Sequence, residues 1–377
     1  MVEIIFFSDS NCSQLYPLNF GKCESSIHFG ARSIANQWKD ALSIFDTIRI
    51  KLNSRLLPTS KSIDTIIKMN SGDRWIQDEI LIAEIEGLDD GEIISPSYPA
   101  DLLNSSIEVF EKCSFGIGED LERMKVKWRT RTLAEDERST WAKIGVFISG
   151  PMERIHIGSG VIIKNCSLNT ENGDIILGND SEIMEGVKIR GPFALGANSQ
   201  IKMGALVYGP TTVGSYCKVG GEINNSVIHD YSNKAHEGFL GNSVIGPWCN
   251  LGAMTTTSNL KNNYSEIKVW NAAKNGYLNS GKIFCGLLMG EHSKTAINTS
   301  FNTGTVVGAF CNVFGYGNPE KHISSFTWGG VNNSVPHDLD KAIETVKKVM
   351  GRRGIRLCKE EEVRIKELYN SSTFGIS

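Results

Sequence analysis

The chain has 377 residues, of which 40% are hydrophobic and 21% charged, and its formal net charge is −3. This length exceeds a single ordinary core and predicts at least two units, and the composition is typical of a soluble globular protein. The small net charge argues against binding to nucleic acid or to a membrane surface through bulk charge. The nine cysteines include no CxxC pair, which favours reduced, mostly buried thiols in a cytoplasmic protein.

Residues 1–140 are predicted to form a mixed α/β unit. The start of the chain has no basic region or cleavage site of a signal peptide, and its apolar run is too short to span a bilayer. Ala31–Leu42 has helical spacing, and Thr59–Ser62 is expected to be a loop. Short aliphatic runs predict three strands, at Val2–Phe7, Ile48–Leu52 and Ile80–Ile85.

An open α/β sheet commonly binds a nucleotide or sugar at the carboxyl ends of its strands. The segment after Phe7, however, contains no GxGxxG and no GxxxxGK pattern that could cradle a phosphate. Lys22 and Arg32 are candidates for contacting a phosphate, although a solvated basic side chain on a scaffold domain is the better explanation for each. Residues 106–141 are rich in alternating charges and are expected to be a helical or irregular connector with a solvated face.

A period of six residues dominates the middle of the chain. A helix repeats near 3.6 residues and a flat strand alternates, so neither explains this spacing. A stacked coil does, because each repeat turns one aliphatic residue inward and places glycine or small residues at the corners. The period predicts a solenoid over residues 141–333. Its strict part consists of Leu177, Ile183, Ile189, Leu195, Ile201, Val207, Val213 and Val219.

The repeat is interrupted twice. It slips between Val219 and Leu240, and residues 255–283 are polar and are expected to form an arm outside the stack. Residues 334–377 are predicted to be helical, with Asp338 as a cap, Gly351 as a stop and a second helix from about Lys359. The two helices are expected to pack against the stack and cap its open end.

Polar residues gather at the register slip and in the arm. Acyl transfer from a thioester to an amine needs a base to take the amine proton, a donor to stabilise the oxyanion, and cations to hold phosphates. His236 is the candidate base, with His229 a weaker one, although a histidine at a coil corner also often serves only to bond the backbone. No HxxxH or HxxxxH pair occurs, so no metal site is predicted. The set comprises Glu222, Asn224, Asn225, His229, Lys234, His236, Asn259, Lys261 and Lys268.

Two segments, KVGGEINNSVIHDYSNKAHEGFLGNSVIGPWCNLGAMTTTSNLKNN and HSKTAINTSFNTGTVVG, resemble the hexapeptide-repeat acyltransferases. The similarity is to the bifunctional N-acetylglucosamine-1-phosphate uridyltransferase/glucosamine-1-phosphate acetyltransferase family. Within it, the chain resembles short bacterial relatives with a reduced nucleotidyltransferase-like N-terminal domain. This resemblance implies a left-handed parallel β-helix, a homotrimer, and an acetyl-CoA site between subunits.

The resemblance also implies roles for individual residues. His236 matches the catalytic histidine, Asn259 the amide of the following loop, and Glu222 a glutamate in the preceding coil. Lys268 matches a basic residue that, with Lys261, would bind acetyl-CoA, and Lys234 would help to bind the substrate. The family's phosphate-gripping arginine and lysine are replaced by Tyr208 and Asn224, and a tyrosine by Phe239; Lys202 and Lys218 are candidates for compensating.

The sequence therefore predicts an acetyl-CoA-dependent acyltransferase acting on an amino-sugar phosphate or a nucleotide-sugar. One alternative is a sugar-phosphate nucleotidyltransferase that uses Mg²⁺ in the N-terminal domain, with the β-helix as a trimerisation scaffold. A second is a non-catalytic trimeric protein that binds a sugar nucleotide. The absence of a glycine-rich loop argues against the first alternative.

Overall fold

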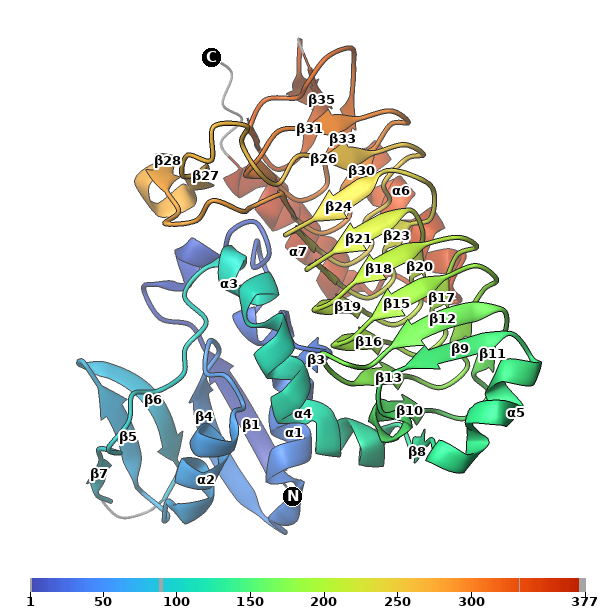
Figure 1. Ribbon diagram of the computed structural model, residues 1–377. Coiled ribbons are helices and arrows are strands. Elements are labelled where there is room, and N and C mark those ends of the chain that lie inside the picture. The colour runs from blue at the N-terminus through green and yellow to red at the C-terminus, as the bar shows by residue number, and fades with distance from the viewer. Residues whose placement is uncertain (1, 88–90, 332, 373–377) are drawn as a thin grey trace.

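A parallel β-helix occupies the middle of the chain in the computed structural model, which describes residues 2–87, 91–331 and 333–372 (Figure 1). The coils give short strands to three sheets, which we name faces A, B and C in the order that the chain visits them. The strands of each face pair in parallel from coil to coil, and only one strand at an end of face A and one at an end of face B are antiparallel among the described residues. Equivalent residues pair from coil to coil, as Leu177 does with Leu195 and Leu195 with Val213. The predicted solenoid is therefore confirmed as a β-helix, whereas its left-handed sense stays a prediction.

The strands of each face follow the coils in order. Face A contains β8 (Arg131–Thr132), β10 (Ile155–Ile157), β13 (Ile175–Leu177), β16 (Phe193–Leu195), β19 (Thr211–Val213), β22 (Val227–Ile228), β25 (Val244–Ile245), β29 (Leu287–Met289), β32 (Thr305–Val307) and β34 (His322–Ile323). Face B contains β11 (Ile162–Ile163), β14 (Glu182–Ile183), β17 (Gln200–Ile201), β20 (Lys218–Val219), β23 (Asn233–Lys234), β30 (Lys294–Thr295), β33 (Asn312–Phe314), β35 (Thr327–Gly330) and β36 (Val335–Pro336). Face C contains β9 (Val146–Ser149), β12 (Cys166–Asn169), β15 (Lys188–Arg190), β18 (Leu206–Tyr208), β21 (Glu222–Asn224), β24 (Phe239–Gly241), β26 (Thr256–Thr257) and β31 (Ser300–Phe301).

The aliphatic residues at every sixth position fill the interior of the coils. All eight are buried, and they belong to one continuous hydrophobic cluster that runs along the stack. Because each inward residue packs on its equivalents in the coils on either side, a cavity at one level cannot be closed by a local shift.

Replacing Ile201 by alanine is expected to lower the free energy of unfolding by about 2–5 kcal/mol, because it leaves such a cavity. Lys218→Ala, on the outer side of the next coil of face B, is expected to change it by no more than about 0.5 kcal/mol. Urea denaturation of the two variants measures the difference. Equal effects of the two changes would contradict the inward assignment of Ile201.

The predicted interruptions of the repeat are both present. The successive inward residues Val219, Ile223 and Ile228 are four and five positions apart, so the corner after Val219 is shortened. After β26, residues 258–286 leave the stack as an arm. The arm carries an antiparallel hairpin of β27 (Lys268–Asn271) and β28 (Gly276–Asn279), with the 3-10 turn η6 (Ala272–Lys274) at its tip.

The N-terminal unit contains a five-stranded mixed sheet with the order β1-β4-β6-β5-β7, in which β1 and β4 are parallel. The three predicted strands and the helix are confirmed. Thr59–Ser62 was expected to be a loop, which is wrong: Thr59 caps a helix there by accepting a hydrogen bond from the Ser62 N–H. The strands are β1 (Val2–Phe7), β2 (His28–Phe29), β3 (Arg32–Ser33), β4 (Ile48–Asn53), β5 (Arg74–Gln77), β6 (Ile80–Ile85) and β7 (Ile93–Ile94). The helices are α1 (Ile34–Ala41), α2 (Ser60–Lys68), α3 (Ser106–Glu111), α4 (Cys113–Lys127) and α5 (Arg138–Lys143), with 3-10 turns at Cys12–Leu15, Glu24–Ser26, Leu42–Ile44, Glu135–Glu137 and Met152–Arg154.

The N-terminal unit covers the outer side of face A. Helices α3 and α4 lie between the N-terminal sheet and the coils (Figure 1), and Cys113 of α4 lies with its sulfur 3.4 Å from the Thr212 hydroxyl of β19. The connector is therefore helical as predicted, but one side of it is buried. The outward residues of face A that join the N-terminal core are Ile176, Ala194, Val227, Val244, Leu288 and Val306.

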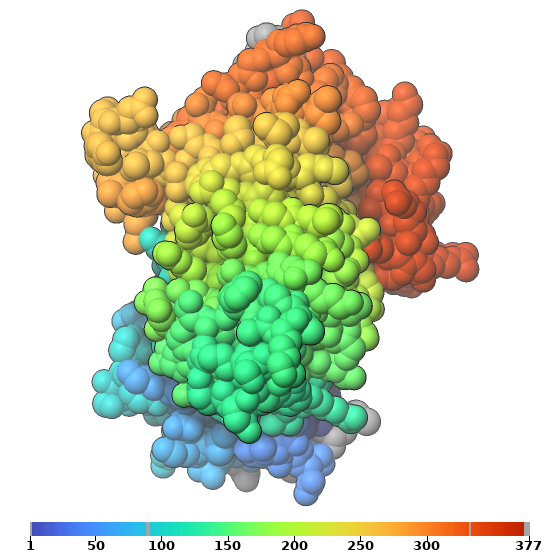
Figure 2. All heavy atoms as spheres, turned by 45° about the vertical axis from the view of Figure 1, so that its right-hand side comes forward, coloured from blue at the N-terminus to red at the C-terminus, as the bar shows by residue number. Residues whose placement is uncertain are grey.

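The C-terminal helices are α6 (Leu339–Gly351) and α7 (Lys359–Ser371), as predicted, and Asp338 caps α6 through a hydrogen bond from the Lys341 N–H. They pack around Phe310 and Phe326, at the corner between faces A and B. They lie beside the coils and not across the open end, contrary to the expected cap (Figures 1 and 2). Residues 373–377 of the predicted C-terminal unit lie outside the described residues.

Candidate active site

His236 lies in the turn that connects β23 on face B with β24 on face C. Its side chain is exposed, and so is that of Glu237 beside it. Within the described residues, the His236 ring makes no hydrogen bond, while its backbone carbonyl accepts one from Lys234. The imidazole is therefore available to a ligand on the surface, as a catalytic base must be.

Two glycines in the coil below shape this turn. Gly220 and Gly221 form the shortened corner after Val219, and Gly221 has a φ of +76°. A Cβ on Gly221 would lie 2.7 Å from the Gly238 carbonyl oxygen and 3.0 Å from that of His236. Only glycine therefore lets the His236 turn lie so close to the corner beneath it.

Lys234 was predicted to bind an anionic substrate, and the structure corrects this prediction. Its side chain points into the coil, where only 1% of the residue is exposed. The ammonium donates hydrogen bonds to the carbonyl oxygens of Gly220, at 3.3 Å, and Glu237, at 3.1 Å, and also to that of His236. Because its three donors are all used inside the protein, none is left for a phosphate.

Glu222, Asn224 and Tyr208 share the outer side of face C, next to the His236 turn. Tyr208 of β18 pairs in register with Asn224 of β21, and Glu222 pairs with Phe239 of β24. The Phe239 ring lies over Gly241, where a Cβ would come within 2.4 Å of the ring. The structure thus places the predicted carboxylate, amide and phenol on one surface, on the two strands next to β24.

A cavity of about 240 Å³ lies on the same face, one to four strands below Glu222. Lys188 and Arg190 line it, and the Arg190 guanidinium lies 5.9 Å from the centre of the Tyr208 ring. No carboxylate of the described residues forms an ion pair with either cation. Sequence reasoning missed both residues, and favoured Lys202 and Lys218 instead; Lys218 lies on the outer side of face B.

Asn259, Lys261 and Lys268 come after β26, whereas His236 precedes β24, so the two groups lie at opposite ends of the strands of face C. Asn259 follows β26 at the corner where face C leads into the arm, and its amide donates a hydrogen bond to the Asn242 side chain at 2.7 Å. The Lys261 ammonium bonds the Glu266 carbonyl and the Ser265 hydroxyl within the arm, so the structure does not support its predicted role in binding acetyl-CoA. Lys268, in β27, is exposed. One chain therefore does not assemble the predicted catalytic pair.

His229, the weaker candidate for a base, lies in the junction between the coils and the N-terminal unit. Its Nε2 accepts the backbone N–H of His28 at 3.1 Å, and its Nδ1 donates to the Ile245 carbonyl at 2.8 Å. Burial, together with a smaller contribution from the neighbouring His28, lowers the pKa of His229 to about 3. Both ring nitrogens are thus occupied, and His229 stays neutral as a structural contact.

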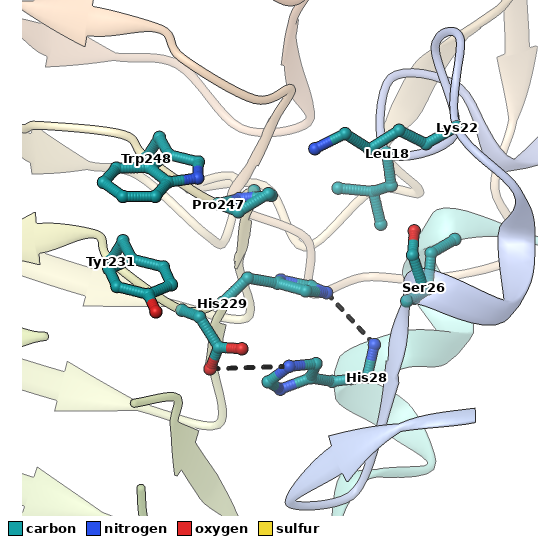
Figure 3. A pocket seen from close by; sticks show the side chains of 11 residues that line it. Leu18, Lys22, Ser26, His28, His229, Tyr231, Pro247 and Trp248 are labelled. Carbon is teal, nitrogen blue, oxygen red and sulfur yellow. Dashed lines mark hydrogen bonds and ion pairs between the residues drawn. The ribbon is translucent and has the colours of Figure 1, made fainter. Parts of the chain in front are cut away.

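A cavity of about 210 Å³ adjoins these two histidines. Figure 3 shows Leu18, Lys22 and Ser26 of the N-terminal unit facing Tyr231, Pro247 and Trp248 of the coils across it. Lys22, considered above as a phosphate ligand, pairs with the buried Glu291, and Arg32 pairs with Asp120 and Asp40. Lys22 and Arg32 are therefore used in ion pairs within the protein and are not available to bind a phosphate.

The carboxyl ends of β1 and β4, where an α/β sheet would bind a nucleotide, are occupied by the protein's own side chains. The buried Arg55 guanidinium donates to the Asp9 carboxylate, with a shortest N–O distance of 2.6 Å, and to the Leu103 carbonyl. Burial raises the pKa of Asp9, but hydrogen bonds from Arg55 and Asn53 outweigh it and hold the pKa below its usual value. This polar network is satisfied without a ligand.

Two other features are absent from residues 2–87, 91–331 and 333–372. No group of three or more histidine, cysteine or acidic side chains there is placed to hold a metal ion. No helix in that part of the chain is long and apolar enough to cross a membrane. The nine cysteines form no disulfide, and seven of them are buried.

Comparison with known proteins gives partial matches. No protein-family model matches the chain. The chain is 33% identical over 144 residues to a bifunctional sugar-1-phosphate nucleotidylyltransferase/acetyltransferase of Sulfurisphaera tokodaii, which covers 38% of this chain and 35% of that protein. It is 30% identical over 127 residues to the bifunctional protein GlmU of Methanococcus aeolicus, covering 34% of this chain and 26% of that protein. The family resemblance is confirmed.

These matches span about a third or less of the curated relatives. Among solved structures, the chain is similar to an Arabidopsis UDP-N-acetylglucosamine acyltransferase, with 16% identity, a TM-score of 0.23, and coverage of 62% of this chain and 85% of that one. The polysialic-acid-specific acetyltransferase NeuO gives 15% identity, a TM-score of 0.24, and coverage of 56% and 98%. At these TM-scores the superpositions add nothing to the assignment.

Proposed function

We propose that this protein is an acetyl-CoA-dependent acyltransferase that acts on an amino-sugar phosphate or a nucleotide-linked amino sugar. The observation that supports this most is the exposed His236 ring, which forms no hydrogen bond with the described residues and lies beside a polar face. The partial similarity to bifunctional nucleotidyltransferase/acetyltransferases points to the same reaction. The winding of the coils would be left-handed, as in the hexapeptide-repeat family.

His236 would act as the general base. Its imidazole takes a proton from the acceptor amine as the nitrogen attacks the thioester carbonyl. A C–N bond forms and the C–S bond breaks, so that the products are an amide and the free thiol of coenzyme A. Asn259 would donate a hydrogen bond to the oxyanion that develops on the carbonyl oxygen.

The separation of His236 and Asn259 favours a homotrimer, in which the two residues come from different subunits. The corner between faces B and C, which carries His236, also exposes Met203 by 66%, Met254 by 52% and Ile297 by 67%. An apolar edge of this kind is typical of a surface that packs against another copy. Lys268 on the arm would then reach the phosphates of acetyl-CoA bound between subunits.

Lys188 and Arg190 would bind the phosphate of the acceptor. Arg190→Ala is expected to raise the KM for the phosphorylated acceptor by about 10-fold or more with little change in kcat, because a hydrogen bond to a charged group contributes about 1.5–3 kcal/mol. Steady-state kinetics measure this, with Lys218→Ala on face B as the control. An unchanged KM in Arg190→Ala would contradict the assignment.

The alternatives have less support. A nucleotidyltransferase would need a nucleotide crevice in the N-terminal sheet, where Arg55 and Asp9 bond each other. A non-catalytic protein would be indicated by a lack of turnover with every acceptor. Release of thiol from acetyl-CoA, measured over a panel of amino-sugar phosphates and nucleotide-linked amino sugars, tests the proposal.

A further inference from the structure

Lys234 takes a position that is aliphatic in the coils on either side. It pairs with Val219 in the coil below, and Leu251 occupies the same place in the coil above. Both neighbours are buried residues of the coil interior. An apolar residue such as leucine or methionine is therefore expected at this inward position, and the presence of lysine requires an explanation.

The ammonium carries its charge without an acidic partner. No carboxylate forms an ion pair with Lys234 among the described residues, and its three acceptors are the backbone carbonyl oxygens of Gly220, His236 and Glu237. Burial lowers the pKa of Lys234 to about 8, which reports that the charged form is disfavoured there. Such a group is costly to keep in an apolar interior.

The three acceptors all belong to one local structure. Gly220 is in the shortened corner of the coil below, whereas His236 and Glu237 are in the turn above it. The ammonium thus connects the exposed turn to the corner beneath it. This corner is the place where the six-residue spacing of inward residues is broken. No side chain other than that of Lys234 bonds the carbonyls of His236 and Glu237 in the described structure.

We propose that Lys234 is a positioning residue for acyl transfer: its buried ammonium fixes the backbone of the His236 turn and thereby the direction in which the imidazole points. This inference rests on the proposed function of His236. Small displacements of a base from its productive geometry cost large factors in rate, so a tether of the backbone affects the chemical step although it never touches the substrate.

The test replaces Lys234 by methionine, which fills the same space without a charge. In Lys234→Met, kcat is expected to fall about tenfold or more, while the KM values for acetyl-CoA and acceptor change less than about threefold. The thermal midpoint at pH 7 is expected to stay the same or rise. Val219→Met, in the same column one coil below, is the matched control and is expected to keep its kcat.

A second measurement tests, independently of catalysis, whether Lys234 restrains the backbone of the His236 turn. Amide hydrogen exchange in residues 235–240 is expected to be faster in Lys234→Met than in the wild type, with no such change in Val219→Met. Unchanged exchange would overturn the tether, whatever the activity. Faster exchange with an unchanged kcat would overturn the positioning role, and a wild type that acetylates no acceptor would overturn the proposed function while the exchange result still decides the tether.

Discussion

Replacing His236 by alanine is expected to lower kcat/KM for acyl transfer by about 10²–10⁴-fold, the usual contribution of a positioned general base. The ring is exposed and forms no hydrogen bond within the described residues, so its removal leaves no buried group unpaired. The free energy of unfolding should therefore change little. The loss is expected mainly in kcat, since the imidazole acts on the amine proton as the C–N bond forms. Thiol release from acetyl-CoA measures it.

The neighbouring Glu237 provides a matched control, because it is exposed in the same turn and its backbone carbonyl bonds the same lysine. Glu237→Gln is expected to retain most of the activity. If His236→Ala and the wild type turned over equally, the base would have to be another group. If Glu237→Gln lost as much activity as His236→Ala, the turn as a whole and not the imidazole would be required.

The interior of the coils could be predicted from the sequence because it follows one physical rule. An inward aliphatic residue at every sixth position has no explanation in a helix or a flat sheet, and all eight such residues are buried. The rule fails where the spacing changes. Counting sixes from Val219 would turn Asn225, Tyr231 and Glu237 inward, whereas the structure turns Ile223, Ile228 and Lys234 inward.

The sequence contains a pattern that indicates which face of the coils the N-terminal unit covers. On face A, the residue before each inward aliphatic residue is often also apolar, as with Ile176 before Leu177 and Val244 before Ile245. The equivalent positions on faces B and C are mostly polar, for example Gln200 and Lys188. Pairs of adjacent apolar residues that recur on only one of the three faces indicate that another part of the protein packs on that face. Helices α3 and α4 pack on face A.

The candidate site was only partly predictable for a different reason. The resemblance selected Glu222, Asn224 and Tyr208 as candidates, and the structure places the three side chains on adjacent strands of one face. The sequence cannot tell which cation points at a ligand. Lys234 belongs to the segment that resembles the family's substrate site, but its ammonium donates hydrogen bonds to three backbone carbonyls. Lys188 and Arg190 line a cavity two coils below Glu222, outside the segments that carried the resemblance.

The junction between the two units is expected to be sensitive to acid because of its histidines. The N-terminal unit meets the coils at His28, whose N–H donates to the neutral Nε2 of His229. Asp230 lies 3.8 Å from the His28 ring, and Lys22 borders the same cavity. A proton on His229 would replace an acceptor by a donor facing another N–H. The contact therefore depends on His229 staying neutral.

Acidification is accordingly expected to destabilise the protein through His229. Burial lowers its pKa to about 3, whereas an ordinary imidazole titrates near 6.5, so between these values the unfolded chain binds a proton that the folded chain does not. The stabilisation is fully present above pH 6.5 and is lost as the pH falls toward 3, by up to about 1.4 kcal/mol per pH unit. His322, with a pKa lowered by burial to about 4, adds to the same trend.

The contribution of His229 can be isolated by measuring urea unfolding from pH 7 to pH 4.5 in the wild type and in His229→Gln. The variant is expected to be less stable at pH 7 but to show a shallower loss on acidification, because one proton no longer distinguishes the folded from the unfolded state. Ile228→Val, at the preceding buried position, is the control: it lowers stability without titrating, so its pH slope should equal that of the wild type. A slope in His229→Gln as steep as that of Ile228→Val would mean that His229 binds its proton equally in both states, and that the histidine contact does not hold the junction against acid.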